Sequence, residues 1–300
     1  MKTWIKSVAA AIAALVLLLF AVLSAGMALG ERKMARTITV PASPVTPRFD
    51  AAHVEHGRYL FSTRGCADCH GASGAGKEVA NGGGTLVVSP NITRGEGSAT
   101  ARYSLLDWVR TVRHGVKPDG TPVMVMPSED YNRLTDDDMS ALISYALQLP
   151  PVIGNPAVMQ LPWAYKVQYG FGMIRDSSEK IDHALPPALA QPVAVTVAHG
   201  AYVANNCISC HGPKFSGGKI PGAPPDWPPA ANLTPGKGSV MPLYPTAQAF
   251  KAMLRTGRRP DGSAVNPIMP YGSIGEMKDV ELEALHIYLL SLPPRAAGQH

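Results

Sequence analysis

The sequence has 300 residues, of which 46% are hydrophobic and 16% are charged, so it can supply apolar cores for more than one domain. Its formal net charge is +5, but five of the 27 basic residues and one of the 22 acidic residues lie in positions 1–36. That leaves 22 basic and 21 acidic residues in positions 37–300, a net charge of +1. A nearly neutral body lacks the basic face of a nucleic-acid-binding protein, and we exclude that class.

The first 36 residues predict a membrane segment. Between Lys6 and Glu31 lie 24 uncharged residues, which is enough for a membrane-spanning helix and exceeds the roughly 7 to 15 apolar residues of a signal peptide. We therefore expect an uncleaved transmembrane anchor. The alternative is a long signal peptide that is cleaved near positions 28–30. Lys2 favours a cytoplasmic start, and both alternatives place residues 37–300 outside the cytoplasm.

A linker and a first helical domain follow. Pro41, Pro44 and Pro47 indicate that residues 37–49 form an extended linker that holds the domain away from the membrane surface. In the domain itself, residues 50–150, the glycine-rich stretch 71–84 is expected to be a loop. Helices are expected at 51–64, 104–114 and 135–149.

An interdomain segment, residues 151–191, separates this domain from a second one. It is rich in proline, yet it carries several large apolar side chains: Leu161, Trp163, Tyr165, Tyr169, Phe171 and Met173. A flexible tether would not need them, so we expect the segment to wrap over both domains, with a short helix, and to fix their relative orientation.

The second domain, residues 192–300, repeats the helical pattern. Helices are expected at 195–204, 246–256 and 278–292, and residues 221–229 are expected to be a loop. The first and last helices of each domain should cross, with Gly57 against the Tyr145 helix and Gly200 against the Tyr288 helix. The chain therefore predicts an all-α fold after its N-terminal helix.

All four cysteines lie in two Cys-x-x-Cys-His motifs, the sequence pattern of covalent haem attachment. Two thiols at this spacing can bond the two vinyl groups of one haem, and the next imidazole then becomes an axial ligand of the iron. The motifs consist of Cys66, Cys69 and His70 in the first domain and of Cys207, Cys210 and His211 in the second.

Three other interpretations of a Cys-x-x-Cys pair fit less well. A zinc site with four thiolates would leave the two identically placed histidines unexplained. A thioredoxin-like redox pair normally follows a strand, whereas each pair here follows a predicted helix. The third interpretation, a structural disulfide, also fits less well. We therefore predict two covalently bound haems c.

The two domains are internal repeats of each other. The offset between matching motifs stays at 141 to 143 residues. Beyond the cysteines, Asn91-Ile92-Thr93 recurs as Asn232-Leu233-Thr234, Arg113 as Arg255, and Met126-Pro127 as Met269-Pro270. Two homologous domains of ordinary size therefore account for the chain outside the N-terminal segment and the linkers.

On these motifs, both halves resemble class I cytochrome c domains, and the tandem is similar to bacterial membrane-bound dihaem cytochromes c. The Asn-x-Thr loop, the Arg-x-Gly turn and the Met-Pro loop are shared with cytochrome subunits of membrane-bound alcohol dehydrogenases, which usually carry three haems. The resemblance implies two tandem class I cytochrome c domains and electron transfer, with the soluble domains on the periplasmic side of the inner membrane.

The resemblance also implies redox partners. A dehydrogenase subunit would be the electron donor, and an oxidase or a soluble cytochrome would be the acceptor. The alternative is a dihaem enzyme, such as a peroxidase or a thiosulfate dehydrogenase, which requires an iron that its substrate can reach. Two Met-Pro loops at matched positions favour the electron carrier over the enzyme, and no catalytic residue is assigned.

The sixth ligand of each iron is expected to be a methionine, a soft neutral ligand that favours ferrous iron. Met269 is the choice in the second domain. In the first domain Met124 and Met126 compete, and we favour Met126 because Pro127 follows it as Pro270 follows Met269. The predicted iron ligands are therefore His70, Met126, His211 and Met269.

Two arginines are candidate partners of the haem propionates. Arg255, Arg258 and Arg259 form a local basic cluster that could also dock an acidic partner. Only Arg255 has a counterpart in the other repeat, at Arg113, and we expect these two to contact propionates while the rest of the cluster is a solvated turn.

Overall fold

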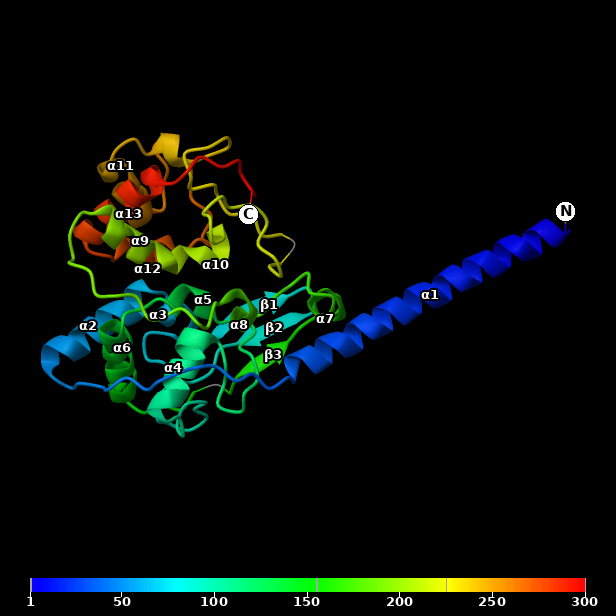
Figure 1. The fold of residues 1–300 in the computed structure, drawn as a ribbon, viewed down its shortest axis with the longest axis horizontal. Helices are drawn as coiled ribbons and strands as arrows, with labels where there is room; N and C mark the ends of the chain where they lie inside the picture. The colour runs from blue at the N-terminus through cyan, green and yellow to red at the C-terminus, as the bar shows by residue number, and fades with distance from the viewer. Residues whose placement is uncertain (1, 155, 225, 300) are drawn as a thin grey trace.

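The structure is a computed structural model and describes residues 2–154, 156–224 and 226–299. Two mainly helical domains lie against each other, and one long helix, α1 (Lys2–Met34), projects from the side of the first domain (Figure 1). By length and composition α1 can cross a membrane. Large apolar side chains along it are exposed, for example Leu15, Leu17 and Phe20.

The three helices predicted in the first domain begin and end within one residue of the predicted positions. Helix α4 begins after Ser104, which forms a capping box with Asp107, and Thr135 caps the next predicted helix in a similar way. The helices of this domain are α2 (Ala51–Thr63), α3 (Cys66–His70), α4 (Leu105–His114), α5 (Ser128–Tyr131) and α6 (Asp136–Gln148).

The second domain repeats this order. Its first helix starts at Val197, two residues later than predicted, because Thr196 is the residue whose side chain caps it. Its elements are α9 (Val197–Ala204), the 3₁₀ turn η1 (Asn205–Cys207), α10 (Ile208–His211), the 3₁₀ turn η2 (Met241–Leu243), α11 (Ala247–Thr256), α12 (Tyr271–Gly275) and α13 (Asp279–Ser291).

The predicted crossing of first and last helices is confirmed in both domains. Helix α2 packs on α6 at Gly57, where an added methyl group would clash with the carbonyl oxygen of Ala141 and lie 2.8 Å from Cβ of Tyr145. Helix α9 packs on α13 at Gly200 in the same way, 2.7 Å from Cβ of Tyr288. The absence of a side chain at each glycine lets the two backbones touch.

A small antiparallel sheet lies beside the helices of this mainly helical fold, and its first strand replaces the second half of the loop predicted at 71–84. Strand β1 (Glu78–Gly82) pairs with β2 (Thr85–Val88), and β2 pairs with β3 (Val158–Gln160). Gly83 and Gly84 connect the first two strands with φ of +59° and +82°. Two successive positive φ values make the tight turn of a hairpin, so this Gly-Gly pair is a hairpin signal.

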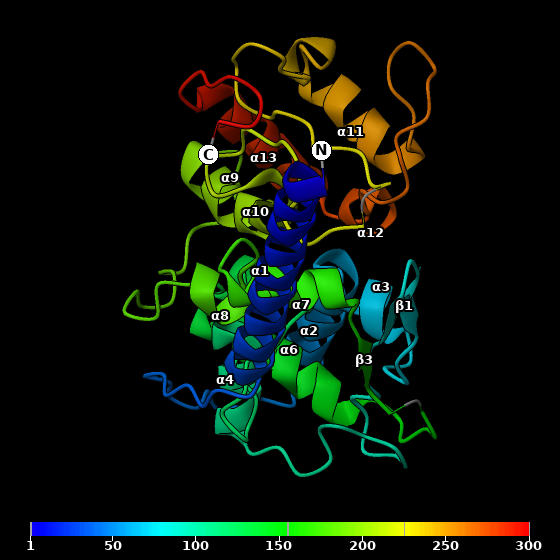
Figure 2. The same cartoon turned by 90° about the vertical axis from the view of Figure 1, so that its right-hand side faces the viewer.

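The linker and the interdomain segment both lie against folded parts of the chain. The linker does not hold the first domain at a distance, because Val45 is buried in that domain's core and Ile38 N–H donates to Gly120 O (2.9 Å). The interdomain segment contains the expected short helix, α7 (Trp163–Gly170), and also α8 (Ser177–Lys180). Helix α7 packs on the end of α1 (Figure 2).

The helix crossings generate a stability prediction. Gly57→Ala and Gly200→Ala should each destabilise their domain by about 3 kcal/mol, because the new methyl group meets backbone atoms that cannot move aside. Thermal unfolding followed by far-ultraviolet circular dichroism would measure this. Gly272→Ala is the control, since nothing lies within 4 Å of its added methyl group and a gain of roughly 0.5–1 kcal/mol is expected. Equal melting temperatures for all three variants would contradict the role of the crossings.

Candidate functional site

Both Cys-x-x-Cys-His motifs are helical: the first is α3, and the second runs from the last residue of η1 through α10. In α3, Cys66 and Cys69 are three residues apart and therefore share a face of the helix. Gly71 follows His70 with φ of +74°, and Gly212 follows His211 with φ of +76°. Glycine readily adopts this backbone conformation, which turns the chain away directly after each histidine.

The two motif histidines are oriented by backbone carbonyls. His70 Nδ1 donates to Pro90 O (3.0 Å), and His211 Nδ1 donates to Ala231 O (2.8 Å). A carbonyl can only accept, so the proton lies on Nδ1 and Nε2 carries the lone pair that a metal needs. Burial lowers the pKa of both imidazoles, which favours this neutral, ligating form.

The repeated Asn-x-Thr loop stabilises those carbonyls, a role that the sequence did not show. Asn91 follows Pro90, donates to Val152 O (2.9 Å) and accepts the N–H of Thr93 (2.8 Å). Asn232, which follows Ala231, makes the same bonds to the C-terminal segment and to Thr234. Both asparagines are buried, so each loop that orients a histidine is held by a satisfied polar network.

The surroundings of the cysteines disfavour a redox pair. The four thiols are free, and no group of three His, Cys, Asp or Glu side chains in the described part of the chain could hold a metal ion. Burial raises the pKa of Cys66 and of Cys207 to about 12, whereas a reactive redox pair needs a lowered thiol pKa. These sites suit thiols that bond to an apolar group.

The two predicted methionine ligands lie in equivalent places. Met126 packs against the core of the first domain and Met269 against that of the second. Each directly precedes a proline that caps a short helix, α5 or α12. Ser177 of the interdomain segment donates to Met126 O (2.6 Å) and ties that loop in place. Iron ligation by these methionines remains a prediction.

The two candidate arginines differ. Arg113 is buried and donates from Nη2 to Leu134 O (3.0 Å) and to Asp136 (3.0 Å), while its Nε is buried without a partner. Trp108, on the same helix, also has a buried indole N–H with no partner. Arg255 instead has a side chain 44% exposed and pairs with Asp279.

Trp108 is a candidate haem-contacting residue that the sequence analysis missed. A buried Trp N–H normally has an acceptor, and Trp108 has none within the protein. The sequence signal for a haem contact was therefore a tryptophan in the same predicted helix as Arg113. The unpartnered donors of Trp108 and Arg113 fit the carboxylates of a haem bound in the first domain. Contact of haem propionates with Arg113 or Arg255 stays a prediction.

The two motif helices touch the opposite domain through equivalent residues. In the first motif, Asp68 accepts a hydrogen bond from Ser273 Oγ of the second domain (2.6 Å). In the second motif, Ser209 occupies the position of Asp68 and donates from N and Oγ to Asp130 of the first domain (2.8 and 2.6 Å). Asp130 and Ser273 are themselves repeat equivalents, so the two contacts are related by a pseudo-two-fold axis.

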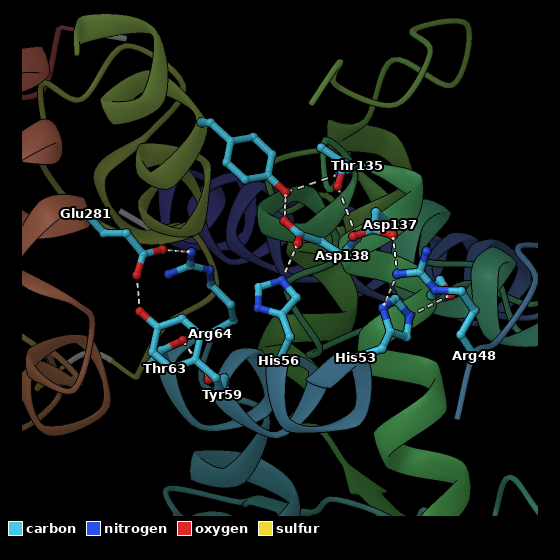
Figure 3. Close-up of polar contacts among 12 residues, drawn as sticks. Arg48, His53, His56, Tyr59, Thr63, Arg64, Thr135, Asp137, Asp138 and Glu281 are labelled. Carbon is cyan, nitrogen blue, oxygen red and sulfur yellow. Dashed lines mark hydrogen bonds and ion pairs between the residues drawn. The ribbon is translucent and has the colours of Figure 1, made fainter. Parts of the chain in front are cut away.

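A second reciprocal pair lies beside the first. Tyr59 donates to Glu281 across the interface, and Tyr202 donates to Asp138 in the opposite direction. Figure 3 shows Tyr59 and Glu281 side by side, with Arg64 next to them and with His56 bonded to Asp138. The two sites therefore face each other across an interface that buries polar groups from both domains.

One charged pair breaks this symmetry. Arg64 and Glu281 form a buried ion pair (2.7 Å) in which the side chains are 5% and 7% exposed. Burial raises the pKa of Glu281, but Arg64 and Tyr59 more than offset it and leave that pKa below its usual range. The residue two positions before the second motif is Asn205, which has no charge to repeat this pair.

The fold and the two sites define a protein with tandem helical domains that each attach one haem. The family model for cytochrome c matches residues 54–150 and 197–293, and the chain belongs to the cytochrome c family. Its two domains bind haem c covalently, and Cys66 with Cys69 and Cys207 with Cys210 have the spacing of haem-attachment cysteines. The family assignment therefore confirms the predicted cofactor and the predicted fold class, apart from the small sheet.

The chain is similar to cytochrome subunits of dehydrogenases. It is 27% identical over 87% of its length to the fructose dehydrogenase cytochrome subunit of Gluconobacter japonicus. It is 28% identical over 85% of its length to the alcohol dehydrogenase (quinone) cytochrome c subunit of Gluconacetobacter polyoxogenes. The chain spans 57% and 59% of these two relatives, which are longer.

The axial ligands can be tested by substitution. Met126→Ala and Met269→Ala should each remove half of the long-wavelength sulfur-to-iron absorption band of the ferric protein, because each removes one of two thioether ligands. Each variant should also let one ferrous haem bind carbon monoxide. Met124→Ala is the matched control and should leave the spectrum unchanged. An unchanged band in Met126→Ala would assign the ligand elsewhere.

The buried ion pair gives a prediction on pH. In the wild type Glu281 has a lowered pKa, so its stabilising contribution is present above about pH 4.5 and is lost as the pH falls further. Arg64→Met should cost about 3–5 kcal/mol at neutral pH, since it leaves a buried carboxylate without its cation. The carboxyl pKa would then rise, so the loss should shrink as the pH falls toward 4.5.

Urea unfolding at several pH values would measure this effect in protein with full haem content. Arg58→Met is the control, because its partner Glu55 and Arg58 itself are mostly exposed (61% and 57%) and such pairs contribute little. Adding Glu281→Gln to Arg64→Met should restore part of the stability. A loss that does not depend on pH would show that the ion pair is not its cause.

Proposed function

We propose that this chain transfers electrons through its two haems, as a subunit or an acceptor of a membrane-associated dehydrogenase. Two haem-attachment sites that face each other across one interface support this function most directly. The dehydrogenase relatives support the same conclusion. Each bound haem supplies a one-electron iron centre; the chain's own residues hold it, set its ligands and exclude water.

The predicted ligand set favours a carrier over an enzyme. With His70 and Met126 in one domain, and His211 and Met269 in the other, neither iron would keep an open position for substrate. Ser177 donates to Met126 O in the first Met-Pro loop, and Met269 N–H donates to Asn266 O (3.1 Å) in the second, so both methionines are held against their cores. A peroxidase or thiosulfate dehydrogenase would require one loop to release its methionine.

The interface gives a reason for having two domains. Ser209 and Asp68 lie within the motifs themselves and are bonded to the opposite domain, so the two attachment helices keep a fixed separation. Fixed geometry lets electrons pass within the chain without a diffusional encounter. Electrons would then enter at one domain and leave from the other.

The partners and the location follow from the same proposal. A dehydrogenase subunit would donate electrons, and an oxidase or a soluble cytochrome would accept them. Helix α1 would anchor the chain in the bacterial inner membrane, with both domains in the periplasm. Helix α1 runs without a break to Met34 and its end is bound to folded residues of the chain, which favours a retained anchor over a cleaved signal peptide.

The carrier function can be tested with the full-length protein in detergent. Titration with a one-electron reductant should reduce both haems, the ferrous protein should not bind carbon monoxide at neutral pH, and peroxide or thiosulfate should not be turned over. Pull-down from solubilised membranes should then recover a dehydrogenase whose substrate reduces the haems. Stoichiometric carbon monoxide binding at one haem, together with turnover of peroxide or thiosulfate, would establish the enzyme instead.

A further inference from the structure

We propose that residues 161–173, built around α7, form a second membrane-contacting element that lies on the outer surface of the bilayer. This element is held against α1 and seats the first domain on the membrane in one orientation. The inference rests on the membrane placement of α1 proposed above. It concerns a different part of the chain, which carries no haem ligand.

The contact between α1 and α7 brings backbone against backbone. A methyl group at Gly26 would lie 2.7 Å from Cε2 of Phe171, and one at Gly30 would clash with the carbonyl oxygen of Lys166. A methyl group at Gly170 would lie 2.7 Å from the amide nitrogen of Gly30. Glycines four residues apart let membrane helices approach this closely, and here the pair receives α7.

The length of α1 places this contact at the membrane surface. The 24 uncharged residues from Ser7 to Gly30 span about 36 Å at 1.5 Å per residue, whereas the hydrocarbon core is about 30 Å thick. Roughly 20 residues, which end near Gly26, therefore fill the core. Helix α7 packs on the turn that follows and so lies at the boundary between lipid and water.

Ion pairs mark the water side of this boundary. Lys166 binds Glu31 (3.1 Å), and Arg36 binds the buried Asp176 (2.7 Å). Burial raises the pKa of Asp176, but hydrogen bonds from Ser178, Tyr169 and Arg36 outweigh burial and leave that pKa below its usual value. The carboxyl is therefore ionised at neutral pH. These pairs fix the rotation of α1 relative to α7 just outside the apolar span.

The outer side of this segment is apolar and exposed. Trp163 is 57% exposed, Phe171 45% and Met173 60%, although a water-facing helix would not need such residues. Helix α7 lies beside the last turns of α1, on the side of the body from which α1 projects (Figures 1 and 2). Because this apolar surface continues directly from a membrane-spanning helix, its occupant is the bilayer, where tryptophan is favoured at the interface.

Quenching by brominated lipid tests this placement. Single cysteines at Trp163→Cys and Met173→Cys, labelled with a bimane fluorophore, would be placed in the full-length haem protein in vesicles of phosphatidylethanolamine and phosphatidylglycerol. The ratio of emission with brominated to unbrominated lipid cancels any quenching by haem. We expect a clear loss of emission at both positions and none at Leu189→Cys, a control position whose apolar side chain is even more exposed (81%).

A label at Leu17→Cys, in the middle of the apolar span, separates the two proposals. Loss of emission at Leu17 without loss at positions 163 and 173 would overturn the interfacial element while the anchor stands. No loss at any position would overturn the membrane anchor itself. Positions 163 and 173 could instead be shielded from water without being quenched by bromine. In a protein that is dimeric or bound to another subunit, that result would assign the surface to a protein partner.

A second variant tests the attachment to α1. Gly30→Val should push α7 away and abolish the loss of emission at position 163, while Leu17 stays quenched. Ala28→Val is the matched control, since Ala28 is exposed on α1 within the same turn and should leave the quenching unchanged. Equal quenching at position 163 in both variants would show that the glycine contact does not hold the element in place.

Discussion

The contact of two helix backbones at one glycine organises each domain. In the first domain, α2 and α6 meet at Gly57, and the haem-attachment helix α3 begins only three residues after α2 ends. The direction of α2 therefore fixes where the two cysteines lie. The second domain repeats the arrangement at Gly200, and a side chain at either position would separate the helices and move the attached site.

The reciprocal interface makes two such domains into one unit. A duplicated sequence presents the same residues from both sides of a pseudo-two-fold axis, so each favourable contact can occur twice. Tyr59 with Glu281 and Tyr202 with Asp138 are such a pair. The contacts of the two motif helices use equivalent positions but exchange donor and acceptor. In the first motif the carboxylate is Asp68 of the motif itself, whereas in the second it is Asp130 of the opposite domain.

The sequence predicted the local elements and the attachment chemistry because both depend on short spacings. Ser104 and Thr135 mark helix starts through their side-chain caps, and the Cys-x-x-Cys-His motif needs no distant residue. The hairpin was missed because Gly83-Gly84 was interpreted only as a loop. Strand β3, the α1–α7 contact and the domain interface depend on pairings over long sequence distances, which periodicity alone does not show.

The departures from symmetry show where the two haem sites became different. In the first domain, Trp108 and Arg113 have buried donors without partners. In the second domain, the position of Trp108 is occupied by Phe250, which has no side-chain donor, and Arg255 pairs with Asp279 at the surface. Hydrogen bonds and burial are among the ways a protein tunes a haem iron. The repeat therefore preserves the predicted iron ligands and the interface, while it varies the donors that we predict to lie near each haem. On that prediction, the two copies of one fold give their haems distinct redox environments.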